Sequence, residues 1–331
     1  PVEKILSTVM VRSLTESGLP HCFYSCSLPL VFTKINKNLP LLLFKTSFSL
    51  HLFVFNKNPK KMIKKINEAT AYIKSIIGSE PQVGIVLGSG LGSFTNEIKI
   101  EKEISYADIP HFHVSTVKGH NSKLVFGEVA GKKVLVMAGR FHYYEGYSAQ
   151  DVVFPIRVMK MLGIQQLMLS NAAGGTNPSF KVGDLMIITD HISQFHENPL
   201  IGKNIEELGT RFPDMSEPYK KTLITKAKAI GLAAGYDLKS GVYIGVTGPT
   251  FETRAEYKMV HTLGADAVGM STVQEVIAAV HMGVPVFAIS VITDIGIRPE
   301  ENIITHEEVL QAAKDAEPKL THIFKEMIAQ L

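Results

Sequence analysis

Apolar positions along the chain repeat with two different periods, and these predict helices and strands in turn. From Met62 onward, apolar side chains recur at helical spacing, which predicts a helix over 63–77 that ends at Gly78. Continuous apolar runs predict buried strands at 83–87, 166–170, 185–188, 242–246, 267–269 and 286–292. Helical spacing predicts further helices at 154–162, 219–230, 254–263 and 273–281, and a C-terminal helical region at 307–331 that breaks near Pro318. The runs at 124–129 and 133–137 flank Ala130 and Gly131 and predict a hairpin.

This alternation of strands and helices predicts an α/β fold around a largely buried sheet. No internal repeat or linker divides residues 62–331, so we expect one domain there. The polar stretch 198–218, with several Gly and Pro residues, predicts a long functional loop.

Residues 1–61 have a different composition from the rest, with many Phe, Leu and Ser residues and few acids. Their apolar run 39–55 contains Pro40, Lys45 and His51, which makes it a poor membrane span. Transit peptides share this basic, acid-poor composition. We favour an upstream extension outside the globular fold, with Met62 as the natural first residue.

Charge and cysteine content exclude several classes of function. Residues 1–61 carry eight basic and two acidic side chains, so the remainder carries 26 basic and 29 acidic ones. Such a mildly acidic body has no nucleic-acid footprint. The only cysteines are Cys22 and Cys26, so the body has no disulfide and no cysteine-based metal site, which fits a reducing compartment.

A glycine-rich loop, Gly88-Ser89-Gly90-Leu91-Gly92, follows the first predicted strand. Glycines let backbone N–H groups approach an anion, and the Ser89 hydroxyl adds a donor. The spacing matches neither the dinucleotide fingerprint nor the P-loop. Taken alone, the loop is equally consistent with a tight structural turn.

Four more polar or small-residue clusters follow predicted strands. In the segment GRFHYYEGY, Arg140 supplies a planar fork suited to phosphate, and His142 can donate to the same anion. SNAAGG, at 170–175, permits close backbone approach to a ligand or tight packing. In GPTFET, Glu252 could accept N–H bonds from a heterocycle or interact with a helix N-terminus. Met270 fits a core position as well as a ligand contact, and Asp294 fits a local turn as well as a site. Because ligands of open α/β sheets bind beyond the carboxyl ends of strands, the clusters together predict a binding site.

The strings GSGLG, GRFHYYEGY, SNAAGG, GPTFET, VGMSTVQEV and THEEVL, in this order, resemble the trimeric purine nucleoside phosphorylases from about Gly84 to the end of the chain. The resemblance implies a single α/β domain with a mixed central sheet flanked by helices. It also implies a homotrimer with an active site near the subunit boundary, a cytoplasmic location in purine salvage, and no metal, cofactor, nucleic-acid or membrane partner.

The resemblance assigns roles to residues at matching motif positions. The residues expected to bind phosphate are Ser89, His120, Arg140, Phe141, His142, Ala172 and Ser271. Those expected to bind the nucleoside are Tyr144, Phe251, Glu252, Val268, Met270, Thr293, Asp294 and His306, together with Phe212 lent by a neighbouring subunit. Among these, His142, Glu252, Asp294 and His306 are expected to be catalytic.

One position departs from the 6-oxopurine-specific pattern, because Asp294 stands where those members carry Asn. An ionised Asp only accepts hydrogen bonds, whereas a protonated one could donate, for example to N7 of the leaving base. Glu252 favours a base with an N1–H donor, so inosine and guanosine are the first expectation.

The expected reaction is direct attack of phosphate on the ribose anomeric carbon, through an oxocarbenium-like state. The alternatives are an adenosine or methylthioadenosine phosphorylase and a non-catalytic nucleoside-binding protein. A dinucleotide-dependent oxidoreductase is disfavoured by the glycine spacing.

Overall fold

The computed structural model describes residues 59–116, 122–297 and 304–331. Residues from Lys57 onward form one compact unit. Its first helix begins at Pro59, slightly ahead of Met62.

The unit is built on a mixed sheet of nine strands among the described residues, in the order β2-β3-β4-β1-β5-β8-β7-β6-β9. The strands are β1 (Val83–Val86), β2 (Lys99–Ser105), β3 (Lys123–Val129), β4 (Lys132–Ala138), β5 (Gln166–Gly175), β6 (Leu185–Ser193), β7 (Lys239–Gly245), β8 (Ala267–Gly269) and β9 (Val286–Ile295). β1 pairs in parallel with β4 and β5, whereas β3 and β4 form the predicted antiparallel hairpin. The mixed sheet expected from the family resemblance is therefore confirmed.

Strand β5 joins the two halves of this sheet. It pairs with β1 and β9 in parallel and, at its end, with β8 in an antiparallel arrangement. In the sheet, β8 pairs with β7, β7 with β6, and β6 with β9, so these four strands and β5 close into a ring. The ring brings the ends of β5, β8 and β9 together at one place.

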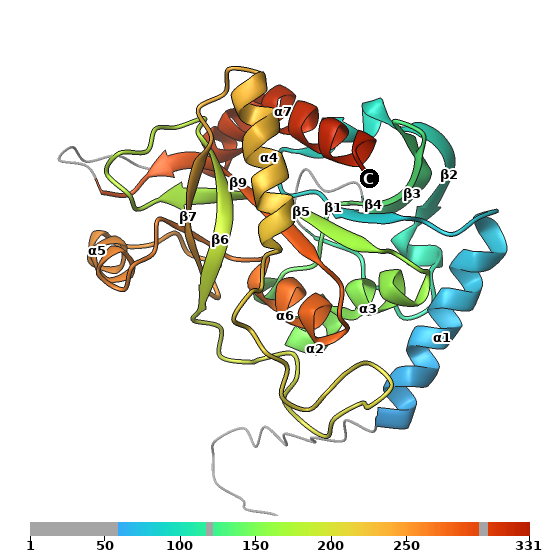
Figure 1. Cartoon of the computed structure of the whole chain (residues 1–331). Coiled ribbons are helices and arrows are strands. Elements are labelled where there is room, and N and C mark those ends of the chain that lie inside the picture. Colours follow the sequence, from blue (N-terminus) through green and yellow to red (C-terminus); the bar gives the residue numbers. More distant parts are fainter. Residues whose placement is uncertain (1–58, 117–121, 298–303) are drawn as a thin grey trace, which may run out of the picture. The chain divides into compact units, whose positions relative to one another are not determined.

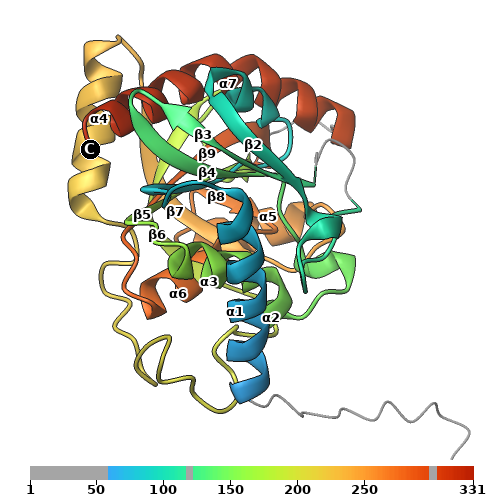
Figure 2. The same cartoon turned by 90° about the vertical axis from the view of Figure 1, so that its right-hand side faces the viewer.

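Helices cover both faces of the sheet (Figures 1 and 2). α4 (Lys221–Ala233) and α7 (His306–Ala329) lie on one face. α1 (Pro59–Ile76), α2 (Ala149–Val152), α3 (Phe154–Met161) and α6 (Val273–His281) lie on the other. α5 (Arg254–Thr262) packs at the edge against β7 and β8, where Tyr257 and Val260 join Ile244 and Val268 in a small apolar cluster. None of the helices in the described part of the chain has the length and apolar character needed to cross a membrane.

Two details of the fold differ from the sequence prediction. α7 does not break at Pro318 but continues through it. Proline costs an interior helix about 3 kcal/mol, and here Ala316 and Leu320 on either side of Pro318 are buried, so packing of both halves offsets that cost. β2 was not predicted, because its first five residues are exposed and charged side chains interrupt its apolar pattern.

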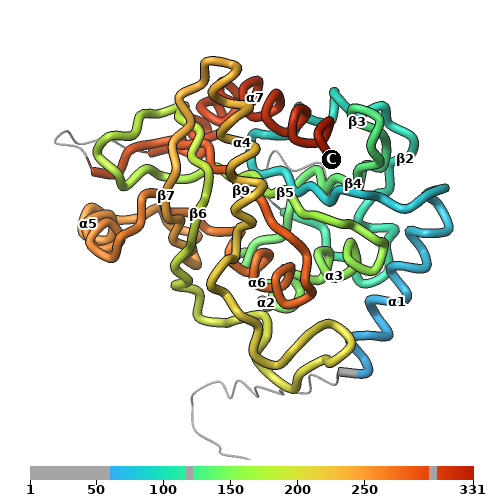
Figure 3. Tube along the Cα trace, viewed as in Figure 1, coloured from blue at the N-terminus to red at the C-terminus, as the bar shows by residue number. Residues whose placement is uncertain are grey.

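The predicted long loop is present between β6 and α4, where the described chain forms no helix or strand (Figure 3, yellow). Its side chains include Phe212, which is 84% exposed.

Candidate active site

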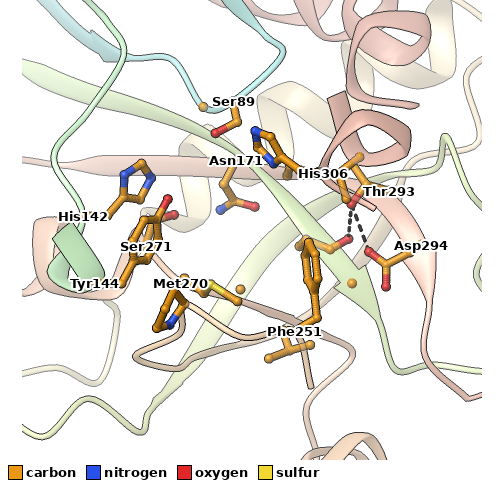
Figure 4. A pocket seen from close by; sticks show the side chains of 18 of the residues that line it. Ser89, His142, Tyr144, Asn171, Phe251, Met270, Ser271, Thr293, Asp294 and His306 are labelled. Carbon is orange, nitrogen blue, oxygen red and sulfur yellow. Dashed lines mark hydrogen bonds between the residues drawn. The ribbon is translucent and has the colours of Figure 1, made fainter. Parts of the chain in front are cut away.

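A cavity of about 360 Å³ opens at the place where β5, β8 and β9 end. Most of the predicted site residues line it, and they come from segments far apart in the sequence (Figure 4). These residues are Ser89, Arg140, His142, Tyr144, Ala172, Phe251, Glu252, Val268, Met270, Ser271, Thr293, Asp294 and His306. Ser89, His142 and Ser271 lie toward one end, and Phe251 and Asp294 toward the other.

The Gly-rich loop is shaped by close packing against β5 and α7. A Cβ atom at Gly88 would lie 2.7 Å from Cα of Asn171, and Gly90 has a φ of +76° with α7 close by. The Gly88 N–H donates to Oγ of Ser170 at 3.3 Å. The glycines permit this close packing, and the same packing places Ser89 on the cavity wall.

Arg140 is buried at the cavity wall by contacts with three segments. Its Nε donates to Glu275 Oε1 at 3.1 Å, and Nη1 donates to the Ser170 carbonyl at 2.9 Å and to Ser271 Oγ at 3.2 Å. Glu275 is 3% exposed, so the ion pair is shielded from solvent. This carboxylate holds the guanidinium in a fixed orientation and balances its charge, so an anion here is recognised by directed donors more than by net charge.

His142 is held by a carboxylate that the sequence analysis did not assign. Its Nδ1 lies 3.1 Å from Glu145 Oε1, which also accepts the His142 backbone N–H at 2.9 Å. Burial lowers the pKa of His142, so the ring is neutral at pH 7. Because the Glu145 carboxylate can only accept, Nδ1 carries the ring hydrogen and Nε2 is an acceptor, suited to a protonated phosphate oxygen.

A strained backbone position lies beside Ser271. Thr272 has a φ of +68°, a conformation that is uncommon for a β-branched residue and costs of order 1–3 kcal/mol. Asn171 holds it by donating from Nδ2 to Thr272 Oγ1 at 2.8 Å. Thr272 also precedes α6, so the strain places Ser271 between the helix start and Arg140.

Capping boxes fix two of the predicted residues. Thr253 and Glu256 cap α5 reciprocally, which positions the preceding Glu252. Thr305 and Glu308 do the same for α7, whose first residue is His306. Both signatures, a threonine followed three residues later by a glutamate, are visible in the sequence.

The other end of the cavity contains two carboxyl groups. Thr293 Oγ1 donates to Asp294 Oδ1 at 3.1 Å and to the Ala173 carbonyl at 3.3 Å, and Tyr257 donates to Asp294 Oδ2 at 2.8 Å. Burial, followed by the nearby charge of Asp294, raises the pKa of Glu252 to about 6. With Phe251 beside them to stack on one face, these groups can hydrogen-bond the edge of a flat heterocycle.

Two of the predicted residues do not line this cavity. The Phe141 ring is buried among Tyr106, Phe112 and Tyr147, where it packs beneath the segment that carries Arg140 and His142. Phe212 lies on the long loop beside Arg211, and it borders a separate surface hollow. His120 falls outside the described residues.

Four residues at the site were missed as functional positions: Glu145, Asn171, Tyr257 and Glu275. Glu145, Asn171 and Glu275 lie inside motifs that the sequence analysis quoted, whereas Tyr257 lies within helix α5 and carries no local signal. Among the described residues, no group of three His, Cys, Asp or Glu side chains is arranged to hold a metal ion.

Comparison with known proteins agrees with this geometry. The family model described as "Phosphorylase superfamily" matches residues 82–329. Purine nucleoside phosphorylase 1 of Geobacillus stearothermophilus is 48% identical over 80% of this chain and 97% of its own length. The Bos taurus purine nucleoside phosphorylase is 44% identical over 80% of this chain and 94% of its own.

A solved structure shows the same likeness. The Schistosoma mansoni purine nucleoside phosphorylase in complex with inosine superposes with a TM-score of 0.77 at 40% identity, covering 81% of this chain and 97% of that one. The long family match and the high coverage of these relatives leave one assignment: the chain belongs to the phosphorylase superfamily and, within it, to the purine nucleoside phosphorylases.

Proposed function

We propose that the chain catalyses the reversible phosphorolysis of purine ribonucleosides and deoxyribonucleosides, with inosine and guanosine as the first substrates to test. The observation that carries this proposal is a single cavity with phosphate-binding donors at one end and carboxyl groups for a heterocycle at the other. Tyr144, Met270 and His306 also line the cavity and are the residues we assign to the ribose. The inosine complex of the Schistosoma mansoni enzyme supports the substrate choice.

The phosphate end is suited to monohydrogen phosphate. Ser89 and Ser271 supply hydroxyl groups, Arg140 supplies a fixed guanidinium, and neutral His142 offers Nε2 to the protonated oxygen. An oxygen of the bound anion attacks the anomeric carbon while the bond from that carbon to purine N9 breaks. The electron pair of that bond goes to the purine, and the proton carried by the phosphate ends on the purine, which balances the reaction.

Rate enhancement comes from proximity and charge placement. Two substrates held in one cavity react in an effectively unimolecular step, and the bound dianion stabilises positive charge on the sugar. At neutral pH the Glu252 carboxyl is mostly ionised, so it accepts the N1–H of a 6-oxopurine. We propose that no metal or organic cofactor takes part and that phosphate is a co-substrate.

The exposed Phe212 supports a proposal about assembly. Its ring is 84% exposed, with the Arg211 guanidinium 5.5 Å from its centroid, while Arg211 donates to the Leu200 carbonyl at 3.0 Å. A large apolar ring held out in this way suits insertion into a neighbouring subunit. We propose a homotrimer in which Phe212 closes the adjacent cavity, acting in purine salvage in the cytoplasm.

The direct test incubates purified protein with inosine and follows hypoxanthine and ribose 1-phosphate with and without phosphate. Phosphate-dependent appearance of both products supports the proposal. Binding of inosine without turnover would instead indicate a non-catalytic nucleoside-binding protein. Light scattering during chromatography measures the assembly separately, and a monomeric active enzyme would refute the trimer.

A further inference from the structure

Three polar side chains from separate segments meet at the base end of the cavity. Glu252 precedes α5, Tyr257 lies on α5 and Asp294 lies on β9. The Tyr257 hydroxyl donates to Asp294 Oδ2 at 2.8 Å and also contacts the Glu252 carboxyl. The hydroxyl therefore donates to the carboxylate of Asp294 and has the Glu252 carboxyl as a neighbour.

The backbone makes room for the Tyr257 side chain at two glycines. A Cβ atom at Gly174 would lie 2.8 Å from the Tyr257 hydroxyl and 3.0 Å from Asp294 Oδ2. A Cβ atom at Gly296 would overlap the Tyr257 ring, at 2.0 Å from its nearest carbon. Tyr257 is itself only 3% exposed. Its position is thus fixed by packing on two sides as well as by hydrogen bonding.

The hydrogen bond between Tyr257 and Asp294 has a defined direction. Burial, together with the charges of Asp294 and Glu252, raises the pKa of Tyr257 far above its ordinary value, so the phenol keeps its proton and acts as a donor. Its hydrogen bond to Asp294 stabilises the ionised form of that carboxyl. Of the two carboxyl groups, Glu252 rather than Asp294 is therefore the one that takes up a proton at mildly acid or neutral pH.

We propose that Tyr257 is a specificity-determining positioning residue that keeps Asp294 as an acceptor and so makes the site take 6-aminopurine nucleosides alongside 6-oxopurine nucleosides. An ionised Asp294 accepts from a 6-amino group, and a protonated Glu252 donates to the unprotonated N1 of the same ring. A 6-oxopurine presents the opposite pattern, with an acceptor at position 6 and a donor at N1. It keeps the bond from N1–H to ionised Glu252 but finds no donor on Asp294.

This inference rests on the proposed phosphorolysis and adds a pH dependence to it. The titratable groups around the pair are Tyr257 and Glu256 on α5, Asp294 on β9, Tyr243 on β7 and His306 at the start of α7. Glu252 is protonated below about pH 6 and ionised above it. The ratio of kcat/KM for adenosine to that for inosine is therefore expected to fall as the pH rises from 6 to 8, by at most about tenfold per pH unit for loss of one proton.

The main experiment compares Tyr257→Phe with the unaltered protein on adenosine and inosine at saturating phosphate. Loss of one hydrogen bond to a charged group lowers the adenosine-to-inosine ratio by about tenfold. In an Asp294→Asn background the same change leaves the ratio within about twofold, because the charge that Tyr257 stabilises is gone. Tyr236→Phe, which removes a phenol hydroxyl outside the cavity, is the matched control and leaves the ratio unchanged.

Calorimetry on the unaltered protein gives a readout that does not depend on folding of a variant. Binding of free adenine at pH 7.5 is expected to take up close to one proton, measured in buffers of different ionisation enthalpy, whereas binding of hypoxanthine takes up none. Equal proton uptake for the two bases would overturn the inference.

The kinetic outcomes separate this inference from the proposed function. If inosine is split and adenosine kcat/KM is below about one thousandth of the inosine value, the phosphorolysis stands and the role of Tyr257 is refuted. An unchanged ratio in Tyr257→Phe refutes that role too. If neither nucleoside is split, the proposed function itself fails.

Discussion

Replacing Glu145 by Gln tests how the phosphate end is held together. The carboxylate accepts four hydrogen bonds at 2.6–3.1 Å, from the His142 backbone and ring and from the Thr116 backbone and hydroxyl. The Ser115 hydroxyl adds longer contacts at 3.4 and 3.5 Å. The substitution keeps the size of the side chain but replaces one oxygen by an NH₂ group. Wherever that group is placed it faces a backbone N–H donor, so at least that hydrogen bond is lost.

The expected destabilisation follows from the protonation equilibrium. Burial alone raises the pKa of Glu145, but hydrogen bonds from His142 and Thr116 outweigh it and hold the pKa at about 2, against an ordinary 4.5. That difference corresponds to about 3 kcal/mol of folding free energy. Because solvent reaches part of the surroundings, we expect Glu145→Gln to lower the free energy of unfolding by about 2 kcal/mol at pH 7.

The pH dependence of this loss has a definite sign. A carboxyl with a lowered pKa stabilises the fold fully above about pH 4.5 and progressively less as the pH falls toward 2. The difference between the two proteins is therefore constant from pH 7 to about 5. It narrows below pH 4.5, because the unaltered protein loses the contribution that the variant never had.

Urea unfolding at pH 7, 5.5 and 4 measures the difference, and steady-state kinetics at pH 7 reports the phosphate KM. We expect that KM to rise several-fold, because the His142 ring loses its charged partner. Glu97→Gln, at an exposed pair with Lys325, is the control and changes stability by less than about 0.5 kcal/mol. A destabilisation below about 0.5 kcal/mol for Glu145→Gln, or one that grows as the pH falls, would refute the reasoning.

Three further predictions concern other parts of the cavity. Arg140→Met leaves the buried Glu275 unpaired and lowers the free energy of unfolding by about 3–5 kcal/mol, measured by urea unfolding. The double variant Arg140→Met/Glu275→Leu regains stability in the same assay but does not regain phosphorolysis. Gly88→Ala pushes a methyl group against Asn171 and costs about 1–3 kcal/mol in the same assay, with a higher phosphate KM. Phe212→Ala raises the inosine KM in steady-state kinetics while thermal unfolding of the chain is nearly unchanged, and an unaltered KM would argue against subunit sharing.

The sequence predicted most elements of the fold, because its strands are continuous apolar runs and its helices have one apolar face. Helix α6 and strand β8 have the predicted bounds. The end of β5 was not predicted, since small residues follow Ser170 and suggest a loop. Pairing with β8 and β9 extends the strand through Gly175, and such pairing between distant segments has no local signal. The ring of strands was not predictable for the same reason.

The site shows a similar division between local and distant information. Residues inside quoted motifs, such as Arg140 and Glu252, were found and do line one cavity. Glu275 and Tyr257 were missed, because each acts through a partner more than 30 residues away along the chain. Their helices give them the spacing of ordinary core positions, and only the folded chain places them beside a site.

Strand β5 also fixes a length. The Ser170 carbonyl holds Arg140 at the phosphate end, and Gly174 makes room for Asp294 and Tyr257 at the base end. Four residue steps along the strand separate them, or about 13 Å of backbone. The main chain of β5 therefore sets the distance between the two ends of the cavity. Under the proposed function, phosphate and nucleoside together span this distance, so a nucleoside longer or shorter by one bond would place its anomeric carbon away from the phosphate.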